Sequence, residues 1–368
     1  MKKTILSLCL VLLTLSALAD TTLTGEGSRG ITIQPAGVNA VEEGVSPTTG
    51  LPLGGMAVPE GFVGLAVTGR YMPMLVQIDN AQGGVGETAP WGAAWADIIY
   101  ETPLTSPGGT RMSFLFSDLI PNAVGPVRSA RVGHVWLRQE WDCGFMFFGG
   151  QTLEGSNINL EFSTYGAKRG EVVFNGTDGL SKAWVKLFST RKGCLAPHNR
   201  SGDAAAISSL IPENHTAREH AFLFSDDPPE GGDTAGEIYI DRRGYVPYCS
   251  TLRYEPDSGQ YSRFMHREDG GMALYEDRDT RTALTFSNVI VQFVEQGWNG
   301  SGEAPVTELV GEGKCELFRD GRHYAGVWQR TGMNQRTVFY GEDGSELPLQ
   351  RGKTLIVILP RDYAITYR

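Results

Sequence analysis

The chain has 368 residues, a length that suggests about two domains of ordinary size. Its residues are 41% hydrophobic and 20% charged, a normal globular balance that excludes a chain disordered throughout. The formal net charge of −10 argues against a general nucleic-acid binder, which needs a basic face. The 47 glycines and 19 prolines favour many turns and short strands over long helices.

Residues 1–19 have the three parts of a secretory signal peptide. Lys2 and Lys3 form a basic start, a mostly apolar stretch follows, and Ala17 and Ala19 are the small residues that a signal peptidase reads. We therefore expect cleavage after Ala19 and a secreted, extracytoplasmic protein. The apolar stretch is too short to span a bilayer comfortably, and no later stretch approaches the needed length, so we predict no transmembrane helix in the mature chain.

The cysteines argue against lipid attachment and against a zinc site. Cys9 follows Leu8 inside the apolar stretch, whereas a lipid-attachment cysteine normally follows a small residue. The remaining cysteines are Cys143, Cys194, Cys249 and Cys315. None forms a CxxC pair, and we predict no metal and no cofactor. Export permits disulfides in any of three full pairings, and buried free thiols are the alternative.

The mature chain is predicted to be an α+β protein with two folded parts. Residues 20–64 are rich in Thr, Gly, Ser and Pro, which indicates an exposed low-complexity linker. Residues 65–225 mix strand and helix patterns and form a mixed α/β N-terminal domain. Residues 226–235 are an interdomain linker with acids, prolines and glycines. Residues 236–368 are a smaller, β-rich C-terminal domain.

Apolar runs give the predicted strands. In the first domain they lie at 72–78, 96–102, 111–117 and 144–150. The glycine turn between the second and third of these runs predicts a hairpin. Between the third and fourth, helical spacing begins after Ser129, whose hydroxyl can cap the helix. In the second domain the predicted strands lie at 236–240, 289–294, 306–310, 323–330, 336–340 and 354–359.

Several short segments also occur in one characteristic order. They are PMLVQIDN (73–80), WADIIYETP (95–103), GGTRMSFLF (108–116), VGPVRSARVG (124–133), FFGG (147–150), APHN (196–199), YEPDSGQYSRF (254–264), SNVIVQF (287–293) and the stretch from 328 to 360. This ordered set resembles the YerB-like family of exported bacterial proteins, also called DUF3048, which is defined by sequence and has no established activity. The resemblance covers roughly residues 70–362. It implies an extracytoplasmic bacterial protein with two family domains. Many members look like lipoproteins, whereas this chain lacks a convincing lipobox.

Basic residues gather at the start of the predicted helix. The candidates for an anion site are Arg111, Arg128, Ser129, Arg131, His134 and Arg138. Arg128 lies just before the predicted helix start, and Arg131, His134 and Arg138 follow at spacings of three and four, which places them on one helix face. A helix start offers free N–H groups and the positive end of the helix dipole, and guanidinium groups fit phosphate or carboxylate. The alternative is that these arginines pair with structural acids, namely Asp97, Glu101 and Asp118.

Two short segments that carry acidic residues could support such a site. Asp79 and Asn80 end one predicted strand, and Asp97 and Glu101 lie four apart on one face of the next. Clustered carboxylates can bind a divalent cation or act as a general acid–base pair. Turn formation is the simpler role for an Asp and an Asn at a strand end.

A loop with proline at its start holds the last polar candidates. His198 and Asn199 can offer hydrogen bonds to a ligand, or His198 can fix the loop to the backbone. Cys194 lies four residues before His198, so a Cys–His nucleophile pair is considered, although no third orienting group is evident. Six aromatic residues can either line a carbohydrate groove or belong to the core. They are Trp91, Trp95, Trp136, Trp141, Tyr71 and Tyr100.

Three functions follow from these patterns. The leading one is a secreted cell-envelope binding or accessory protein whose arginines recognise an anionic group, such as phosphate in a cell-wall polymer or a lipid headgroup, with an envelope protein as a possible partner of the second domain. A protein-interaction scaffold without a small ligand is another, and it predicts an exposed apolar patch on the second domain.

The remaining function is an envelope enzyme acting on a phosphate- or glycan-containing wall substrate. The order of strand, hairpin and arginines resembles in outline the LytR-CpsA-Psr cell-wall phosphotransferases, which hold pyrophosphate with arginines and an acid. That resemblance implies convergence of Asp97 or Glu101 with Arg111, Arg128 and Arg131 in one open cleft. Whether the chain is an enzyme stays open on the sequence alone.

Overall fold

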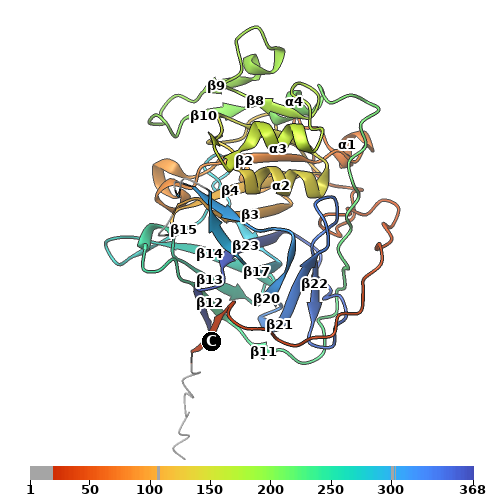
Figure 1. Cartoon of the computed structure of the whole chain (residues 1–368), viewed down its shortest axis with the longest axis vertical. Coiled ribbons are helices and arrows are strands. Elements are labelled where there is room, and N and C mark those ends of the chain that lie inside the picture. The colour runs from red at the N-terminus through yellow and green to blue at the C-terminus, as the bar shows by residue number, and fades with distance from the viewer. Residues whose placement is uncertain (1–19, 106–107, 300–301, 303) are drawn as a thin grey trace, which may run out of the picture.

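The computed structural model describes residues 20–105, 108–299, 302 and 304–368. The predicted signal peptide, its cleavage after Ala19 and the position of Cys9 lie outside the described residues. Within them the fold is α+β and mostly β-sheet, with two large sheets packed face to face and the helices gathered at one end (Figure 1). The part of the chain that is described contains no helix long and apolar enough to cross a membrane.

The larger sheet has eleven strands and runs through most of the molecule (Figure 1). Its order is β11 (Asp233–Thr234), β21 (Arg322–Arg330), β20 (Gly311–Arg319), β17 (Asn288–Val294), β23 (Thr354–Pro360), β3 (Ile98–Pro103), β4 (Thr110–Phe116), β2 (Met74–Ile78), β5 (Gly144–Phe147) and β8 (Val173–Asn175), with β22 (Val338–Gly341) beside β21. β23 pairs in parallel with β3. The segments 65–225 and 236–368 therefore share one sheet, and the predicted linker 226–235 contributes its edge strand β11.

The second sheet has seven strands and lies against one face of the first. Its order is β1 (Thr21–Thr24), β24 (Ala364–Tyr367), β12 (Glu237–Ile240), β13 (Ser250–Glu255), β14 (Gln260–His266) and β15 (Met272–Leu274), with β16 (Thr285–Phe286) beside β14. The other face of the larger sheet is covered by α2 (Val132–Trp141), whose Trp141 Nε1 donates to Tyr100 Oη over 2.9 Å. The remaining elements are α1 (Leu65–Thr68), α3 (Ile158–Thr164), α4 (Ala204–Ser208) and the pairs β6 (Thr152–Leu153) with β7 (Ser156–Asn157), β9 (Phe188–Thr190) with β10 (Arg200–Gly202), and β18 (Gln296–Trp298) with β19 (Pro305–Thr307).

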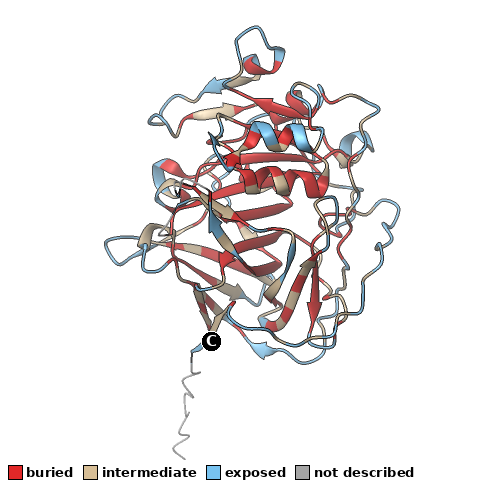
Figure 2. Ribbon diagram, in the orientation of Figure 1, coloured by how far each residue is buried: buried red, intermediate tan, exposed pale blue. Residues whose placement is uncertain are grey.

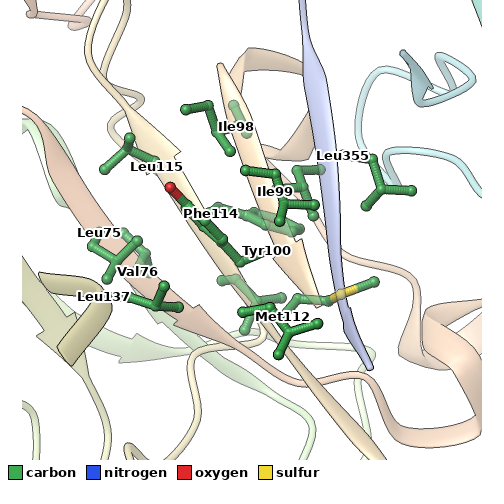
Figure 3. Close-up of a cluster of buried hydrophobic side chains, with 14 of the residues drawn as sticks. Leu75, Val76, Ile98, Ile99, Tyr100, Met112, Phe114, Leu115, Leu137 and Leu355 are labelled. Carbon is green, nitrogen blue, oxygen red and sulfur yellow. The ribbon is translucent and has the colours of Figure 1, made fainter. Parts of the chain in front are cut away.

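The central strands are buried on both faces, which explains why the sequence shows them as continuous apolar runs. All five residues of β2 and all seven of β4 are buried, and Figure 2 shows the middle of the larger sheet in the buried colour. Close packing between β2, β3, β4, β23 and α2 is visible in Figure 3, where Leu75, Phe114 and Leu137 are among the labelled side chains. The four strands predicted in the first domain are present, and the second and third form the expected hairpin, β3 with β4.

Residues 20–64 differ from the exposed linker that their composition predicts. Thr21–Thr24 form strand β1, which pairs with β24. Arg29 reaches the other sheet, where it donates to the Cys315 carbonyl at 2.8 Å and pairs with the buried Glu316 at 2.5 Å. Thr48 and Thr49 are buried against β4. The segment is held by backbone pairing and polar contacts, which a scarcity of large apolar residues does not reveal.

The cysteines are present as thiols. Cys143, Cys194, Cys249 and Cys315 are all free, and all but Cys194 are buried. Burial raises the pKa of the Cys143 thiol to about 12, which makes it a poor nucleophile at neutral pH. Of the two alternatives left by the sequence, the structure shows free thiols.

Candidate functional site

Asp79 is the point where several predicted site residues meet. It follows β2, and the antiparallel register that pairs Ile78 with Met112 brings it beside Arg111 at the start of β4. Its Oδ1 lies 4.0 Å from Arg111 Nη2, and its Oδ2 lies 3.3 Å from Arg128 Nε. Nδ1 of His198 contacts the same Oδ2. The carboxylate therefore has two arginines and one histidine around it.

Ser129 joins the third arginine to this group. Arg111 Nη1 donates to the Ser129 carbonyl at 2.7 Å and to its hydroxyl at 3.0 Å. Arg131 Nη1 donates to the same hydroxyl at 2.9 Å. We call Arg111, Arg128 and Arg131 around Asp79 the arginine cluster. The structure thus brings four of the six predicted anion-site residues together.

The arginine cluster lies at the carboxyl ends of three parallel strands, β2, β5 and β8. The loop after β5 holds the backbone of the cluster, because the Phe148 N–H donates to the Arg128 carbonyl and the Ala130 N–H to the Gly149 carbonyl, both at 3.0 Å. The Gly149 N–H in turn donates to Oδ1 of Asn175, the last residue of β8, over 2.8 Å. Ligands of open α/β sheets bind at this end of the strands, so the position is suited to a ligand site.

Positive charge exceeds negative charge in the arginine cluster, since it holds three guanidinium groups and one carboxylate, of which Arg111 and Arg128 pair with that carboxylate. Arg111 is only 3% exposed, and its Nε has no hydrogen-bond partner among the described residues. Burial lowers the pKa of Arg111 to about 10; Asp79 opposes this shift, and Arg131 and Arg128 add to it. The pKa of Arg131 is also lowered, by burial and by Arg128. The cluster is therefore short of negative charge, while the side chains of Arg128 (29% exposed) and His198 (27% exposed) leave it open to solvent.

Two of the predicted anion-site residues lie outside the cluster, and the predicted cap is different. The helix begins at Val132 with Arg131 as its N-cap, so Ser129 does not cap it. His134 is buried; its Nδ1 accepts from the Arg131 N–H at 2.9 Å and its Nε2 donates to Thr102 Oγ1 at 2.8 Å. Burial, with Arg111 and Arg131, lowers the pKa of His134 well below its usual value, so this imidazole is neutral.

Arg138 has a structural place at the far end of the helix. Its Nε donates to the Cys143 carbonyl at 2.8 Å, and its Nη2 lies 2.7 Å from Asp142. Arg128 precedes the helix and Arg131 is its N-cap, so of the three residues predicted on one helix face only His134 and Arg138 lie within the helix.

The acids expected near the arginines lie elsewhere. Asp97 precedes β3 and its Oδ2 accepts the N–H groups of Ser117 at 2.5 Å and Asp118 at 3.0 Å. Glu101 points to the second sheet, where it pairs with Arg263 at 2.5 Å and Arg242 at 3.2 Å. The predicted convergence of Asp97 or Glu101 with the arginines is therefore wrong, as is their pairing with those arginines as structural acids. The described residues hold no group of three or more metal-ligating side chains.

Asn80, Asn199 and Cys194 do not join the cluster. Asn80 Nδ2 donates to Thr110 Oγ1 at 2.7 Å, and this hydroxyl donates to Glu101. The Asn199 carbonyl accepts the Arg191 N–H at 2.8 Å and closes the loop between β9 and β10. Because Nδ1 of His198 is directed to Asp79, the structure pairs this histidine with an aspartate and not with Cys194.

The six aromatic residues belong to the core or pack against it. Trp91, Trp141 and Tyr100 are buried, and Tyr71, Trp95 and Trp136 are partly buried beside them. They form no carbohydrate groove.

Sequence reasoning missed Tyr248. It lies in a 3₁₀ helix, η5 (Val246–Tyr248), more than a hundred residues from the arginines. Burial raises the pKa of Tyr248, as do the charges of Tyr245 and Asp79, while Arg111 lowers it. The tyrosine is therefore within electrostatic reach of the cluster, and no local motif marks it.

The Asp97–Asp118 pair gives a testable pH dependence. Burial raises the pKa of both carboxyl groups, and the charge of Asp118 raises that of Asp97 further. The folded protein therefore binds protons that the unfolded chain releases above a pKa of about 4, and the stability that this pair contributes falls as the pH rises through that window. We expect Asp118→Asn to gain stability relative to the wild type as the pH rises.

Urea unfolding at pH 4.5 and pH 8 measures this difference. A stability difference between Asp118→Asn and wild type that is the same at both values would contradict the shared burial of two ionisable carboxyl groups. Asp269→Asn, on the exposed surface, is the matched control and should show no such trend.

The fold and the site together define a mostly β, two-sheet protein with an arginine-rich polar site at the carboxyl ends of parallel strands. Two family models match the chain: the N-terminal domain of DUF3048, a protein of unknown function, over residues 64–217, and the DUF3048 C-terminal domain over residues 239–356. The chain belongs to this YerB-like family.

Relatives agree with this assignment. The chain is 28% identical over 275 residues to "Putative lipoprotein YerB" of Bacillus subtilis (strain 168), covering 73% of this chain and 76% of that protein. The crystal structure of the YerB protein from Bacillus subtilis matches with a TM-score of 0.66 and 23% identity, over 87% of this chain and 99% of that one. This structural likeness shows a shared fold.

Proposed function

We propose that this protein works outside the cytoplasm, at the bacterial cell envelope, and binds an anionic ligand that carries phosphate. The signal-like start of the chain and the name of the Bacillus subtilis relative support the location. Binding is assigned to Arg111, Arg128, Ser129 and Arg131. The observation that carries the proposal is the buried guanidinium of Arg111, with its unpaired Nε, beside two further arginines and a single carboxylate.

Accessibility separates this cluster from the other buried arginines. Arg242 and Arg263 also outnumber the carboxylate that they share, Glu101, but all three side chains are at most 1% exposed and no ligand can reach them. In the arginine cluster the Arg128 side chain is 29% exposed, and the Ser129 hydroxyl lies between two guanidinium groups. A phosphate oxygen can be held there by charge-assisted hydrogen bonds, which are about twice as strong as neutral ones.

The scaffold alternative has less support. It calls for an exposed apolar patch on the second domain. The large apolar side chains that the description shows as exposed in 236–368 are Tyr245, Met272 and Trp298, and they lie on three different elements.

Thermal unfolding of residues 20–368 with sodium phosphate or pyrophosphate, at constant ionic strength, tests the proposal. A ligand at about a hundred times its dissociation constant should add roughly 2.7 kcal/mol of stability. We expect the shift to disappear in Arg128→Ala, whose side chain is partly exposed, and to persist in Arg281→Ala, an exposed arginine paired with Glu276. A wild-type protein that no phosphate compound stabilises would refute the proposal, as would an undiminished shift in Arg128→Ala.

A further inference from the structure

His198 and Asp79 form a pair at the margin of the arginine cluster. His198 lies in the loop between β9 and β10, and its Nδ1 contacts Asp79 Oδ2. The same oxygen lies 3.3 Å from Arg128 Nε. The imidazole and the Arg128 guanidinium are therefore neighbours on one carboxylate oxygen. The Asp79 side chain is 5% exposed, whereas the His198 side chain is 27% exposed.

This contact fixes which imidazole nitrogen is available for chemistry. A carboxylate can only accept hydrogen bonds, so the proton of the neutral imidazole is held on Nδ1. The lone pair is then on Nε2, the nitrogen directed away from Asp79. The site consequently holds a nucleophilic nitrogen on an imidazole that shares a carboxylate oxygen with Arg128. A histidine oriented by a carboxylate is one of the activated nucleophiles of covalent catalysis.

We propose that the site transfers a phosphoryl group through His198, and that its substrate is a diphosphate. This inference rests on the proposed function, because the arginines must first bind the phosphate. The lone pair of Nε2 attacks the terminal phosphorus, an N–P bond forms, and the P–O bond to the bridging oxygen breaks. The bridging oxygen keeps the electron pair and leaves as a phosphate anion.

Water completes the cycle. A water oxygen attacks the phosphorus of the phosphohistidine, the N–P bond breaks, and its electron pair returns to Nε2. The two protons of the water go to the released phosphate groups and the solvent, so one diphosphate and one water give two phosphates. Arg111, Arg128 and Arg131 stabilise the negative charge on the phosphoryl oxygens. Asp79 is a positioning residue that keeps the proton on Nδ1.

The choice of a diphosphate follows from the single acid in the cluster. Asp79 is the one carboxylate that the described contacts bring to these arginines, and it is already paired with His198 and Arg128. With no second carboxyl group to protonate the leaving oxygen, the site favours a leaving group that is stable as an anion. Phosphate is such a group, whereas the alkoxide of a simple alkyl phosphate is not.

His215 is a matched control for His198 in the same chain. His215 is 25% exposed and lies 3.6 Å from Asp142, near Arg138 and Arg218. Here the contact uses Nε2, which also bonds to the Asp142 carbonyl at 2.9 Å, and Arg138 is occupied by the helix end. His215→Gln therefore removes a similar histidine without touching the arginine cluster.

The experiment follows labelled pyrophosphate and an alkyl diphosphate on residues 20–368, with a simple alkyl monophosphate, whose leaving group is an alkoxide, for comparison. We expect phosphate release from both diphosphates and a protein-bound label that is stable to alkali and lost in acid, as phosphohistidine is. His198→Gln should lose the label and at least 100-fold in release, while pyrophosphate still gives its thermal shift. His215→Gln should match the wild type.

Asp79→Asn should separate positioning from binding. Removing the carboxylate charge should tighten pyrophosphate binding. The amide NH2 of asparagine can donate to Nδ1 and hold the imidazole proton on Nε2, which should lower phosphate release at least 100-fold. A wild-type protein that binds pyrophosphate but neither releases phosphate nor takes up label would overturn phosphoryl transfer and leave the proposed anion site standing. Release that survives in His198→Gln would also overturn it. Absence of binding in the wild type would instead refute the anion site itself.

Discussion

Arg111→Met is expected to weaken phosphate binding strongly without unfolding the protein. Burial lowers the pKa of Arg111 to about 10, so the folded protein holds this charge less readily than the unfolded chain does. At any pH below that value the charge therefore costs stability, by roughly 3 kcal/mol for a shift of this size. Methionine fills much of the same volume without the charge, and Asp79 keeps Arg128 and His198 as partners. We expect stability that is unchanged or higher by up to about 3 kcal/mol.

Binding should respond in the opposite direction. A hydrogen bond from a charged donor contributes about 1.5–3 kcal/mol, so loss of Arg111 should weaken phosphate binding by roughly 10- to 100-fold. Urea unfolding and titration of the same variant with pyrophosphate measure both effects. If Arg111→Met loses more than about 2 kcal/mol of stability, the arginine is a structural ion-pair partner and the cluster is part of the scaffold.

Glu101→Gln should have the opposite effects, with a large loss of stability and no direct effect on phosphate binding. Burial acts to raise the pKa of Glu101, but Arg263 and Arg242 outweigh it and the pKa is lowered. Glutamine keeps the shape and leaves two buried guanidinium groups without a counter-charge. Breaking a buried ion pair in this way costs about 3–5 kcal/mol.

The pH dependence of this loss has a definite sign. A lowered carboxyl pKa contributes stability above the unfolded value of about 4.3 and loses it as the pH falls through the folded pKa. The difference between wild type and Glu101→Gln in urea unfolding should therefore shrink in acid. Glu237→Gln, a half-exposed glutamate paired with Arg253 and Arg368, is the control and should cost less than about 1 kcal/mol. Equal losses in the two variants would show that the two sheets do not depend on the Glu101 charge.

The strands at the centre of the fold were predictable because they are buried on both faces. β2, β3, β4, β5 and β23 appear as mostly apolar runs, which can be recognised as buried strands without knowing which strands they pair with. β20 was missed because its first half, GEGK, is polar and only its second half is buried. The sharing of one sheet between the two family segments was also beyond prediction, since nothing in β3 or β23 alone says that they pair.

The candidate site was also predictable only in part. Arg128, Ser129 and Arg131 were found because they are neighbours in the chain, and Arg111 because it follows a glycine turn. The contact between Asp79 and His198 joins residues 119 positions apart, and neither local pattern indicates the other. Glu101 was assigned to the wrong partners because the arginines that face it, Arg242 and Arg263, come from the second sheet.

Strand β1 determines at which end of the molecule the described chain begins. Because Thr21–Thr24 are paired with β24, the described chain starts at the end of the molecule where the C-terminus also lies, and Asp20 is 3.9 Å from Arg368 (Figure 1). The loop between β9 and β10 that carries His198 lies at the opposite end. In a protein attached to a membrane surface at its β1 end, the loop with His198 would lie on the far side of the body from that surface. The arginine cluster would then face outward, where it could sample the space between membrane and wall but not the headgroups of its own membrane.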